Sequence, residues 1–410
     1  MKLFSQYKGL NRANYILFIG RIVTNMGAMI WPMLTLILNK KIGFNATETA
    51  LFTIFSGILF LPANLLGGHV ADRFNKKHVI IYCDIVSIVL FVISGFLPLS
   101  IFSICVLLVG AFFQTLESPA YQALVADITP AEKREKAFSL LYLGANIGLI
   151  LSPTLAGLLF NNYLWLCFVI SGLSISVSTV LIGLFVKDEK LEEAPTEDVE
   201  ESADDGLNIW SIIRNSGALI AFIISLAFYQ GAYSQFGYLM PLDIAKAFPE
   251  KGSVIYGTIT SVNCFLVVLF TPIITMVFEK VDLTKKFAFG VFLQVVSFAA
   301  FLLSFGIIGG YYVSIALFTF GEILTTIMMG AFLAERVPES HRGRIFGVTN
   351  FAGAFMQGIT QFGSGRMFDT FGPAYAWAFS IAMTMVAVIA ALMLVYLDKK
   401  EFSQLYVQAD

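Results

Sequence analysis

The sequence predicts an all-α membrane protein with twelve transmembrane helices. Three observations lead to this prediction: an apolar composition, a series of long apolar runs, and an uneven distribution of Lys and Arg between alternate loops. Of the 410 residues, 57% are hydrophobic and only 13% are charged, whereas soluble domains carry about 25% charged residues. A soluble core could not bury this much apolar surface, so we expect the chain to fold in a lipid bilayer.

A helix that crosses a bilayer needs roughly 20 predominantly apolar residues. Twelve runs of this kind follow one another along the chain, separated by short polar segments. The predicted spans are 14–38, 48–68, 79–98, 102–127, 138–160, 164–186, 217–240, 253–279, 287–305, 310–334, 345–366 and 375–397.

Lys and Arg indicate which ends of the spans face the cytoplasm. The N-terminus and every second loop contain twenty of them, the opposite side contains five, and Arg21 lies inside a span. An excess of this kind marks the cytoplasmic side. We therefore expect both termini to be cytoplasmic in a multi-pass protein of the cell (inner or plasma) membrane.

One cytoplasmic segment differs from the other loops. The stretch KDEKLEEAPTEDVEESADDG is acidic and polar, so it cannot bury apolar area and is predicted to be a linker. It divides the spans six and six. The predicted organisation is an N-terminal six-helix bundle at 1–186, a cytoplasmic linker at 187–210 and a C-terminal six-helix bundle at 211–410.

The two halves contain an internal repeat. The stretch DITPAEKREKAFSL at 127–140 matches ERVPESHRGRIFGV at 335–348 at an offset of 208, and the Lys pair at 76–77 recurs at 285–286 at an offset of 209. Two such halves, related by a pseudo-two-fold axis along the membrane normal, hold a solute near the midplane and give it alternating access.

The loop after the second span carries a recognisable motif. It reads LGGHVADRFNKKH and resembles the helix 2–3 turn of the major facilitator superfamily, Gly-x-Leu-Ala-Asp-Arg-x-Gly-Arg-Arg/Lys. Asn75 replaces the second Gly; because Asn tolerates left-handed backbone, we expect the turn to be kept. The matching residues are Gly68, Asp72, Arg73, Lys76 and Lys77.

The resemblance implies a conformational latch on the cytoplasmic side. Asp72 would face the N-terminus of the eleventh span, where the helix dipole is positive. Arg73 or Lys76 would pair with an acid at the end of the fourth span, and Asp127 matches best. The alternative is a loop that only follows the positive-inside rule.

The fifth span resembles an antiporter signature of the same superfamily. In YLGANIGLILSPTLAGLL, small residues recur every four positions, which allows close helix approach, and Pro153 loosens the backbone. The family pattern is Gly-x-x-x-Gly-Pro-x-x-Gly-Gly, and it favours export by antiport, as in bacterial twelve-helix drug:proton antiporters. A generic packing face is the alternative. The small residues are Gly144, Gly148, Ser152 and Ala156.

Charged residues within the spans are candidates for proton coupling or substrate binding. A charge at the bilayer centre costs roughly 2.5–3.5 kcal/mol on insertion scales, so it needs a function or a partner. The candidates are Arg21, Glu117 and Glu322, and we expect Arg21 to pair with Glu117. Structural ion pairs are the alternative. Asp84, near the start of its span, is expected to reach the cytoplasmic interface.

For two of these charged residues, a comparison with the family pattern adds information. Glu322, in FTFGEILTT, resembles a Gly-Glu in helix 10 of some bacterial multidrug exporters, which implies a proton carrier. Many drug:proton antiporters have an Arg in helix 4, but the fourth span here has Glu117 instead. That arginine role cannot be transferred to this chain.

Polar, aromatic and Met side chains on several spans are expected to line the substrate cavity, because such surfaces adapt to many apolar ligands. These candidates are Asn25, Trp31, Tyr142, Asn146, Tyr229, Gln230, Tyr233, Asn263, Met328, Asn350 and Gln357.

Other function classes are disfavoured by the sequence. It has no phosphate-binding loop and no serine nucleophile elbow, so neither ATP-driven transport nor an enzyme is expected. The net charge of −2 argues against a nucleic-acid partner. Four scattered cysteines predict no disulfide and no metal site, and no cofactor is expected.

The predicted function is therefore secondary active transport: proton-coupled efflux of hydrophobic or cationic compounds by alternating access. The expected partners are a small-molecule substrate, protons and the lipid bilayer, and the protein is expected to act as a monomer. One alternative is a proton-coupled importer or facilitator of a small solute such as a sugar, peptide or lipid-like metabolite. The other is a membrane receptor or scaffold that transports nothing.

Overall fold

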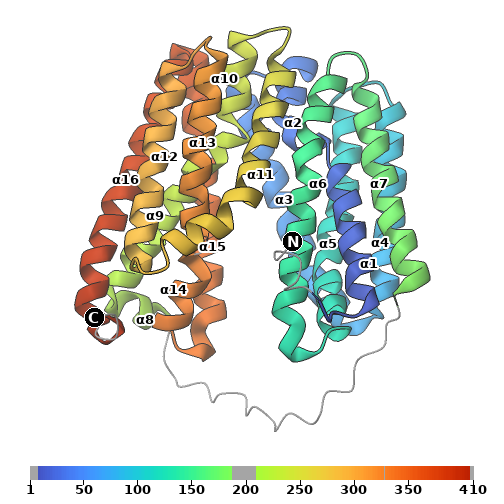
Figure 1. Cartoon of the computed structure of the whole chain (residues 1–410). Helices are drawn as coiled ribbons and strands as arrows, with labels where there is room; N and C mark the ends of the chain where they lie inside the picture. Colours follow the sequence, from blue (N-terminus) through green and yellow to red (C-terminus); the bar gives the residue numbers. More distant parts are fainter. Residues whose placement is uncertain (1–7, 187–208, 327, 407–410) are drawn as a thin grey trace. The chain divides into compact units, whose positions relative to one another are not determined.

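The chain folds into helices throughout its described parts. The computed structural model describes residues 8–186, 209–326 and 328–406, so all but the last two residues of the predicted linker lie outside the described residues. Within these ranges the α-helices (Figure 1) are α1 (Arg12–Met26), α2 (Ile30–Leu36), α3 (Ala46–Arg73), α4 (Lys76–Phe96), α5 (Ile101–Asp127), α6 (Arg134–Leu159), α7 (Leu164–Phe185), α8 (Ile209–Asn215), α9 (Gly217–Tyr233), α10 (Leu239–Ala247), α11 (Gly252–Val277), α12 (Leu283–Leu303), α13 (Ile308–Thr326), α14 (Met328–Arg336), α15 (Glu339–Phe371) and α16 (Pro373–Glu401).

Eleven helical segments in the described ranges are long and apolar enough to cross a membrane. Each overlaps one of the predicted spans. The remaining predicted span, 345–366, lies inside α15, which is long enough but is not one of the eleven. Polar side chains such as Asn350 and Gln357 make α15 less apolar than its neighbours.

The first predicted span is interrupted, which the sequence analysis did not anticipate. Helix α1 ends at Met26, and α2 begins at Ile30. The intervening Gly27 lies so close to α7 that a Cβ atom there would be 1.9 Å from Ser174 Oγ. The backbone carbonyl of Gly27 accepts a hydrogen bond of 2.6 Å from Ser171 Oγ. The break thus exposes a carbonyl that a serine of α7 satisfies.

The described residues form two compact units. Unit 1 consists of 8–44, 52–186 and 250–268, and unit 2 consists of 45–51, 209–249, 269–326 and 328–406. Each unit therefore includes a short segment from the other half of the sequence. The first residues of α3 belong to unit 2, and the first two thirds of α11 belong to unit 1.

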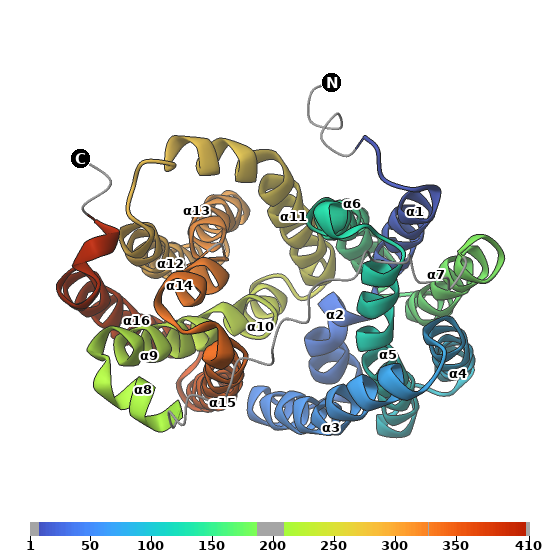
Figure 2. The ribbon, with the colours of Figure 1, turned by 90° about the horizontal axis from the view of Figure 1, so that it is seen from below.

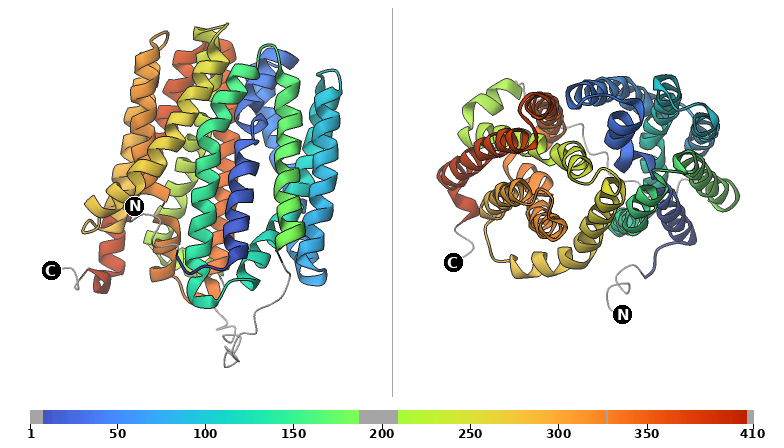
Figure 3. Two further views of the ribbon diagram at one scale, coloured as in Figure 1. Left: turned by 45° about the vertical axis from the view of Figure 1, so that its right-hand side comes forward. Right: turned by 90° about the horizontal axis from the view of Figure 1, so that it is seen from above.

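The order of neighbouring helices is the same in both units (Figures 2 and 3). In unit 1, α1 packs against α6 and α7, while α4 packs against α5 and α7. In unit 2, α9 packs against α15 and α16, while α12 packs against α13 and α16. This correspondence agrees with the internal sequence repeat, and it makes α5 and α13 equivalent helices.

Each unit has its own apolar core. The core of unit 1 includes Leu17 of α1, Leu124 of α5 and Ile182 of α7. In unit 2, the ring of Phe222 stacks on that of Phe332 with centroids 4.2 Å apart. These cores fix the helices that carry the polar residues described next.

Candidate functional site

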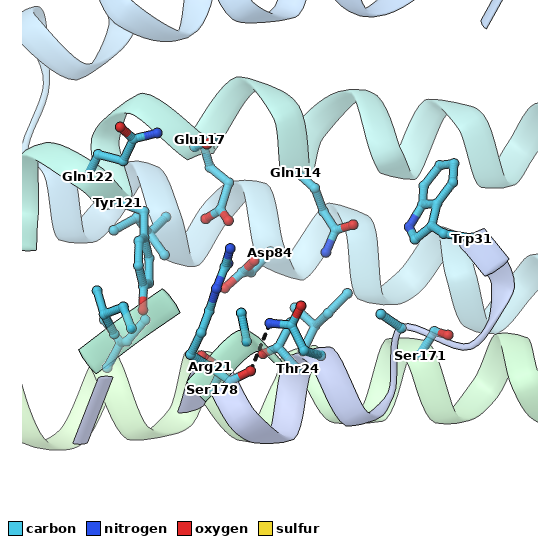
Figure 4. A pocket seen from close by; sticks show the side chains of 18 of the residues that line it. Arg21, Thr24, Trp31, Asp84, Gln114, Glu117, Tyr121, Gln122, Ser171 and Ser178 are labelled. Atoms are coloured by element: carbon cyan, nitrogen blue, oxygen red, sulfur yellow. Dashed lines mark hydrogen bonds between the residues drawn. The ribbon is translucent and has the colours of Figure 1, made fainter. Parts of the chain in front are cut away.

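A cavity of about 460 Å³ lies inside unit 1. Side chains from α1, α2, α4, α5, α6 and α7 line it (Figure 4). Three charged residues occupy its wall, although the surrounding helices are apolar in composition. They are Arg21 of α1, Asp84 of α4 and Glu117 of α5.

Arg21 supplies the positive charge of the cavity. Its guanidinium lies over the ring of Tyr121, with the central carbon 5.9 Å from the ring centroid, which is within the range of a cation–π contact. Figure 4 shows the guanidinium reaching between the carboxyl groups of Glu117 and Asp84. Of the two acids, Glu117 is the one with which Arg21 interacts electrostatically.

Asp84 is a site residue that the sequence analysis missed. It was expected to reach the cytoplasmic interface, but it lines the cavity and is only 4% exposed. Its Oδ2 accepts a hydrogen bond of 2.6 Å from Thr179 Oγ1 of α7. The predicted span began at residue 79, which placed Asp84 near the membrane surface, whereas α4 begins at Lys76 and carries Asp84 further into the bundle.

Glu117 keeps one carboxyl oxygen without a partner. Its Oε2 is buried and accepts no hydrogen bond from any described residue. Arg21 and Asp84 both interact electrostatically with Glu117. The expected ion pair between Arg21 and Glu117 does not form among the described residues.

Glu322 lies in unit 2, on α13, the helix equivalent to α5. Its Oε1 accepts a hydrogen bond of 2.8 Å from the hydroxyl group of Tyr233 on α9. One turn along each helix, Thr325 Oγ1 donates to the hydroxyl oxygen of Tyr229 at 2.5 Å. Tyrosines of α9 therefore stand beside Glu322, whereas Arg21 of α1 stands beside Glu117.

Only some of the residues that were predicted to line the substrate cavity line the unit 1 cavity. Asn25, Trp31 and Tyr142 line the unit 1 cavity, while Asn146 is hydrogen-bonded to the backbone of Tyr142 and is outside its lining. The side chain of Met328 lies outside the described side chains. The rest do not line this cavity: Tyr229, Gln230, Tyr233, Asn263, Asn350 and Gln357.

The loop motif between α3 and α4 contains one ion pair. Lys76 Nζ pairs with Asp127 at the end of α5, which is the acid expected as a partner. Lys77 Nζ donates to the backbone oxygens of Gly183 and Val186 at 2.8 and 2.7 Å, so it caps the C-terminal end of α7.

Two other charged residues of the motif are exposed, and Asn75 adopts a backbone conformation other than the left-handed one. Gly68 has open space around it, and Asp72 and Arg73 are exposed. Asn75 was expected to keep the turn because Asn tolerates left-handed backbone, but its φ is −60° and its ψ is 118°, so it does not use that conformation. Its side chain accepts a hydrogen bond of 3.0 Å from the backbone N–H of His78. Asn75 serves as the N-cap of α4, a role that Asn favours.

The small-residue stripe of α6 forms close contacts with two helices of unit 1. A Cβ atom at Gly148 would lie 2.5 Å from the backbone oxygen of Ile22 in α1. Next to the stripe, a Cβ atom at Gly157 would lie 2.4 Å from the backbone oxygen of Ser253 in α11. The stripe therefore sets the position of α1, the helix that carries Arg21.

The sequence was also compared with known proteins. Residues 16–360 match the Major Facilitator Superfamily. The chain belongs to this superfamily. A Na⁺, Li⁺, K⁺/H⁺ antiporter of Planococcus maritimus is 24% identical over 83% of this chain and 85% of that protein. The quinolone resistance protein NorA of Staphylococcus aureus is 25% identical over 36% of this chain and 38% of that protein.

Solved structures with a similar fold are transporters as well. A POT family transporter in complex with a thioalcohol-conjugated peptide has a TM-score of 0.73 at 15% identity and is covered to 95%, as is this chain. A bacterial homologue of the human lysosomal transporter Spinster has a TM-score of 0.68 at 15% identity, with 95% of this chain and 97% of that chain covered. At such identity the likeness concerns the fold alone.

This superfamily protein is thus a membrane transporter of small molecules. Its apolar helical segments place it in the cell membrane as a multi-pass protein. The superfamily consists of transporters, which are not typically enzymes.

Proposed function

We propose that this superfamily member is a proton-coupled antiporter that exports hydrophobic or cationic compounds by alternating access. The observation that carries the proposal is the meeting of Arg21, Asp84 and Glu117 in one cavity. One basic and two acidic side chains within apolar helices raise the free energy of the folded protein in a bilayer. A transport cycle that uses their charge explains why they are present.

The charge of the cavity supports exchange. With both carboxyl groups ionised and Arg21 positive, the three side chains carry a net charge of −1. Either a proton on one carboxyl group or a bound cation restores neutrality, and the two compete for the same charge. The buried oxygen of Glu117 that lacks a partner is the position where either can bind. Competition of this kind couples cation release to proton uptake.

Glu322 is proposed as a second coupling group, in unit 2. The hydroxyl group of Tyr233 donates to its carboxyl group, and a hydrogen bond to a carboxyl group changes its affinity for protons. We further propose that Lys76 and Asp127 act as a latch with Asp72 and Arg73 of the same motif.

The proposed topology has twelve spanning helices in two six-helix halves, with α15 as the twelfth and both termini cytoplasmic. The twenty-to-five distribution of Lys and Arg supports this orientation. The protein is proposed to work as a monomer.

A second candidate function is exchange of monovalent inorganic cations for protons. It is favoured by the relative of Planococcus maritimus, whose name gives Na⁺, Li⁺ and K⁺ as its ions. The cavity also contains the amide groups of Gln114 and Gln122, whose oxygens are ligands that such ions accept. An importer of small solutes and a receptor remain as alternatives, and a liposome assay of proton movement distinguishes them from an antiporter.

The proposal is tested with purified protein in liposomes that enclose a pH-sensitive dye. After a proton gradient is imposed, ethidium, Na⁺ or K⁺ is added, and the resulting proton movement is recorded. Release of protons by ethidium supports drug export, whereas release by Na⁺ or K⁺ alone supports inorganic cation exchange. Solute moving together with protons indicates an importer, and no movement with any solute indicates a receptor.

Matched variants identify the coupling groups. Glu117→Gln and Asp84→Asn are expected to reduce substrate-dependent proton movement by about tenfold or more, equal to about 1.4 kcal/mol of coupling. Glu250→Gln makes the same chemical change at an exposed loop position and serves as the control. If Glu117→Gln and Glu322→Gln both transport at the parent rate with unchanged pH dependence, the assignment is wrong.

A further inference from the structure

Unit 2 contains a buried carboxyl group that the proposed transport cycle does not use. Asp243 lies on α10 and is only 1% exposed. It is not part of the unit 1 cavity, and it makes no ion pair among the described residues. The predicted seventh span ended at residue 240, so the sequence analysis left Asp243 in a loop.

Only one of the two carboxyl oxygens of Asp243 has a hydrogen-bond partner. Oδ2 accepts a hydrogen bond of 2.9 Å from the hydroxyl group of Tyr311 on α13. Oδ1 is buried and has no partner among the described residues, and the same holds for Nε1 of Trp377 on α16. The indole N–H lies close enough to interact with the Asp243 carboxyl group, although its geometry falls short of a hydrogen bond.

Aromatic rings surround this group of side chains. The indole of Trp377 stacks on Phe301 of α12 with centroids 5.1 Å apart and an interplanar angle of 8°. Phe301 also contacts Tyr311, with centroids 6.0 Å apart. Such surroundings solvate a carboxylate poorly, so an ionised Asp243 without a cation partner would be costly.

The charged and titratable groups around Asp243 are few. From α13 it meets Tyr311, and from its own helix it interacts with Lys246, one turn away. Lys246 is exposed, and its ammonium group lies over the ring of Phe368, 5.0 Å from the centroid. The side chains that α12 and α16 present, Phe301 and Trp377, do not titrate.

We propose that Asp243 is a further proton-binding site of this transporter, distinct from the unit 1 cavity and from Glu322. The proton comes from water and binds at Oδ1, and no other bond changes. The neutral carboxylic acid fits the aromatic surroundings. Loss of the proton places a negative charge beside Trp377 and so changes the electrostatic environment of its indole.

Trp377 offers a direct readout, because it adjoins the proposed site. The protein has four Trp residues, so replacing Trp31, Trp165 and Trp210 with Phe leaves Trp377 as the sole indole. This protein is reconstituted in lipid nanodiscs, and its fluorescence is recorded from about pH 5 to about pH 9, a range that includes documented values for buried carboxyl groups. We expect a single reversible transition in emission.

The variants decide whether Asp243 causes that transition. Asp243→Asn is expected to abolish it and to keep the emission of the low-pH form at every pH. Glu279→Gln, an exposed acid of the same unit, is expected to leave it unchanged. If the parent shows no transition, or if Asp243→Asn retains it, the proposal is overturned.

A second variant covers the case in which Asp243→Asn does not fold. Tyr311→Phe retains the acid and removes the hydrogen bond to Oδ2. Since that donor stabilises the carboxylate more than the neutral acid, its removal should move the fluorescence midpoint to higher pH. An unchanged midpoint would contradict the proposal. Neither readout depends on transport, so this test can fail while the proposed antiport stands, and the reverse also holds.

Discussion

Arg336 of α14 and Asp398 of α16 form a two-point ion pair that is shielded from solvent. Arg336 Nε donates to Oδ1 at 2.6 Å, and Nη2 donates to Oδ2 at 2.8 Å. The two side chains are 3% and 0% exposed. The hydroxyl group of Tyr406, beyond the end of α16, donates to Oδ2 at 2.5 Å. The pair thus joins α14, α16 and the segment that follows α16.

Breaking this pair is expected to destabilise the protein. Asp398→Asn leaves the buried Arg336 guanidinium with only the exposed carboxyl group of Glu335 as a counterion, and breaking a buried ion pair typically costs about 3–5 kcal/mol. The double replacement Arg336→Met with Asp398→Leu removes both charges and should recover most of the loss. Thermal unfolding in detergent measures both effects. Equal unfolding temperatures for Asp398→Asn and the parent would show that the pair contributes little.

The ion pair between Lys76 and Asp127 is expected to affect transport more than stability. Its side chains are 17% and 19% exposed, and partly solvated pairs contribute about 1 kcal/mol or less. Asp127→Asn should therefore slow transport while changing the unfolding temperature little, and the exchange Lys76→Asp with Asp127→Lys should restore part of the rate.

Lys285→Gln is the control for this latch. Lys285 occupies the repeat-related position in unit 2 and pairs with Asp282 at 2.5 Å, but it is 59% exposed. Its replacement is expected to leave transport near the parent rate. A loss of transport as large as that of Asp127→Asn would mean that total loop charge, and not the latch, sets the rate.

The close approach of α6 and α1 predicts an effect of Gly148→Ala on the cavity. The added Cβ would lie 2.5 Å from the backbone oxygen of Ile22 and 2.8 Å from Asn25 Cβ, so α1 must shift, at a cost of about 1–3 kcal/mol. Because α1 carries Arg21, substrate affinity should fall as well. Gly57→Ala, where no atom lies within 4 Å, should fold at least as well as the parent. Unfolding curves and the KM for substrate would show the contrast, and equal KM values would contradict it.

Thr179 is expected to tune the pH dependence of transport through Asp84. Thr179→Val keeps the shape of the side chain but removes the hydrogen bond of 2.6 Å to Oδ2. Since that bond favours the carboxylate, the pH profile of transport should move to higher pH. Thr179→Ser retains the hydroxyl group and should retain the profile. A purely structural role of Thr179 would change the unfolding temperature of the Val variant without moving its pH profile.

The sequence predicted the eleven apolar helical segments and two of the three charged residues that line the cavity. Arg21 and Glu117 lie among apolar residues of predicted spans. A charged side chain in a bilayer has a high free-energy cost, which indicates a function or a partner. Asp84 and Thr179 gave no comparable signal. An acid near a helix end is ordinarily solvated, and a hydroxyl in a helix ordinarily bonds its own backbone.

Other features depended on contacts between distant segments. The break between α1 and α2 is stabilised by Ser171 of α7, and no local pattern reveals that partner. Asn75 was read as a replacement for Gly, although the same residue type also caps helices, and the start of α4 at Lys76 decided between the roles. Asp243 could not be recognised from the sequence, because Tyr311 and Trp377, which lie beside it, come from distant helices.

The composition of the two compact units has a consequence for assembly in the cell. The first residues of α3 belong to unit 2, where Asp369 accepts hydrogen bonds from the backbone N–H groups of Ala46 and Thr47 at 3.0 and 2.8 Å. The first part of α11 belongs to unit 1. A ribosome that has synthesised only the first six spans has therefore not yet made all of unit 1. Insertion of the early helices should stay reversible until α11 emerges, and a gene cut between the halves should yield stable protein only when both pieces are made together.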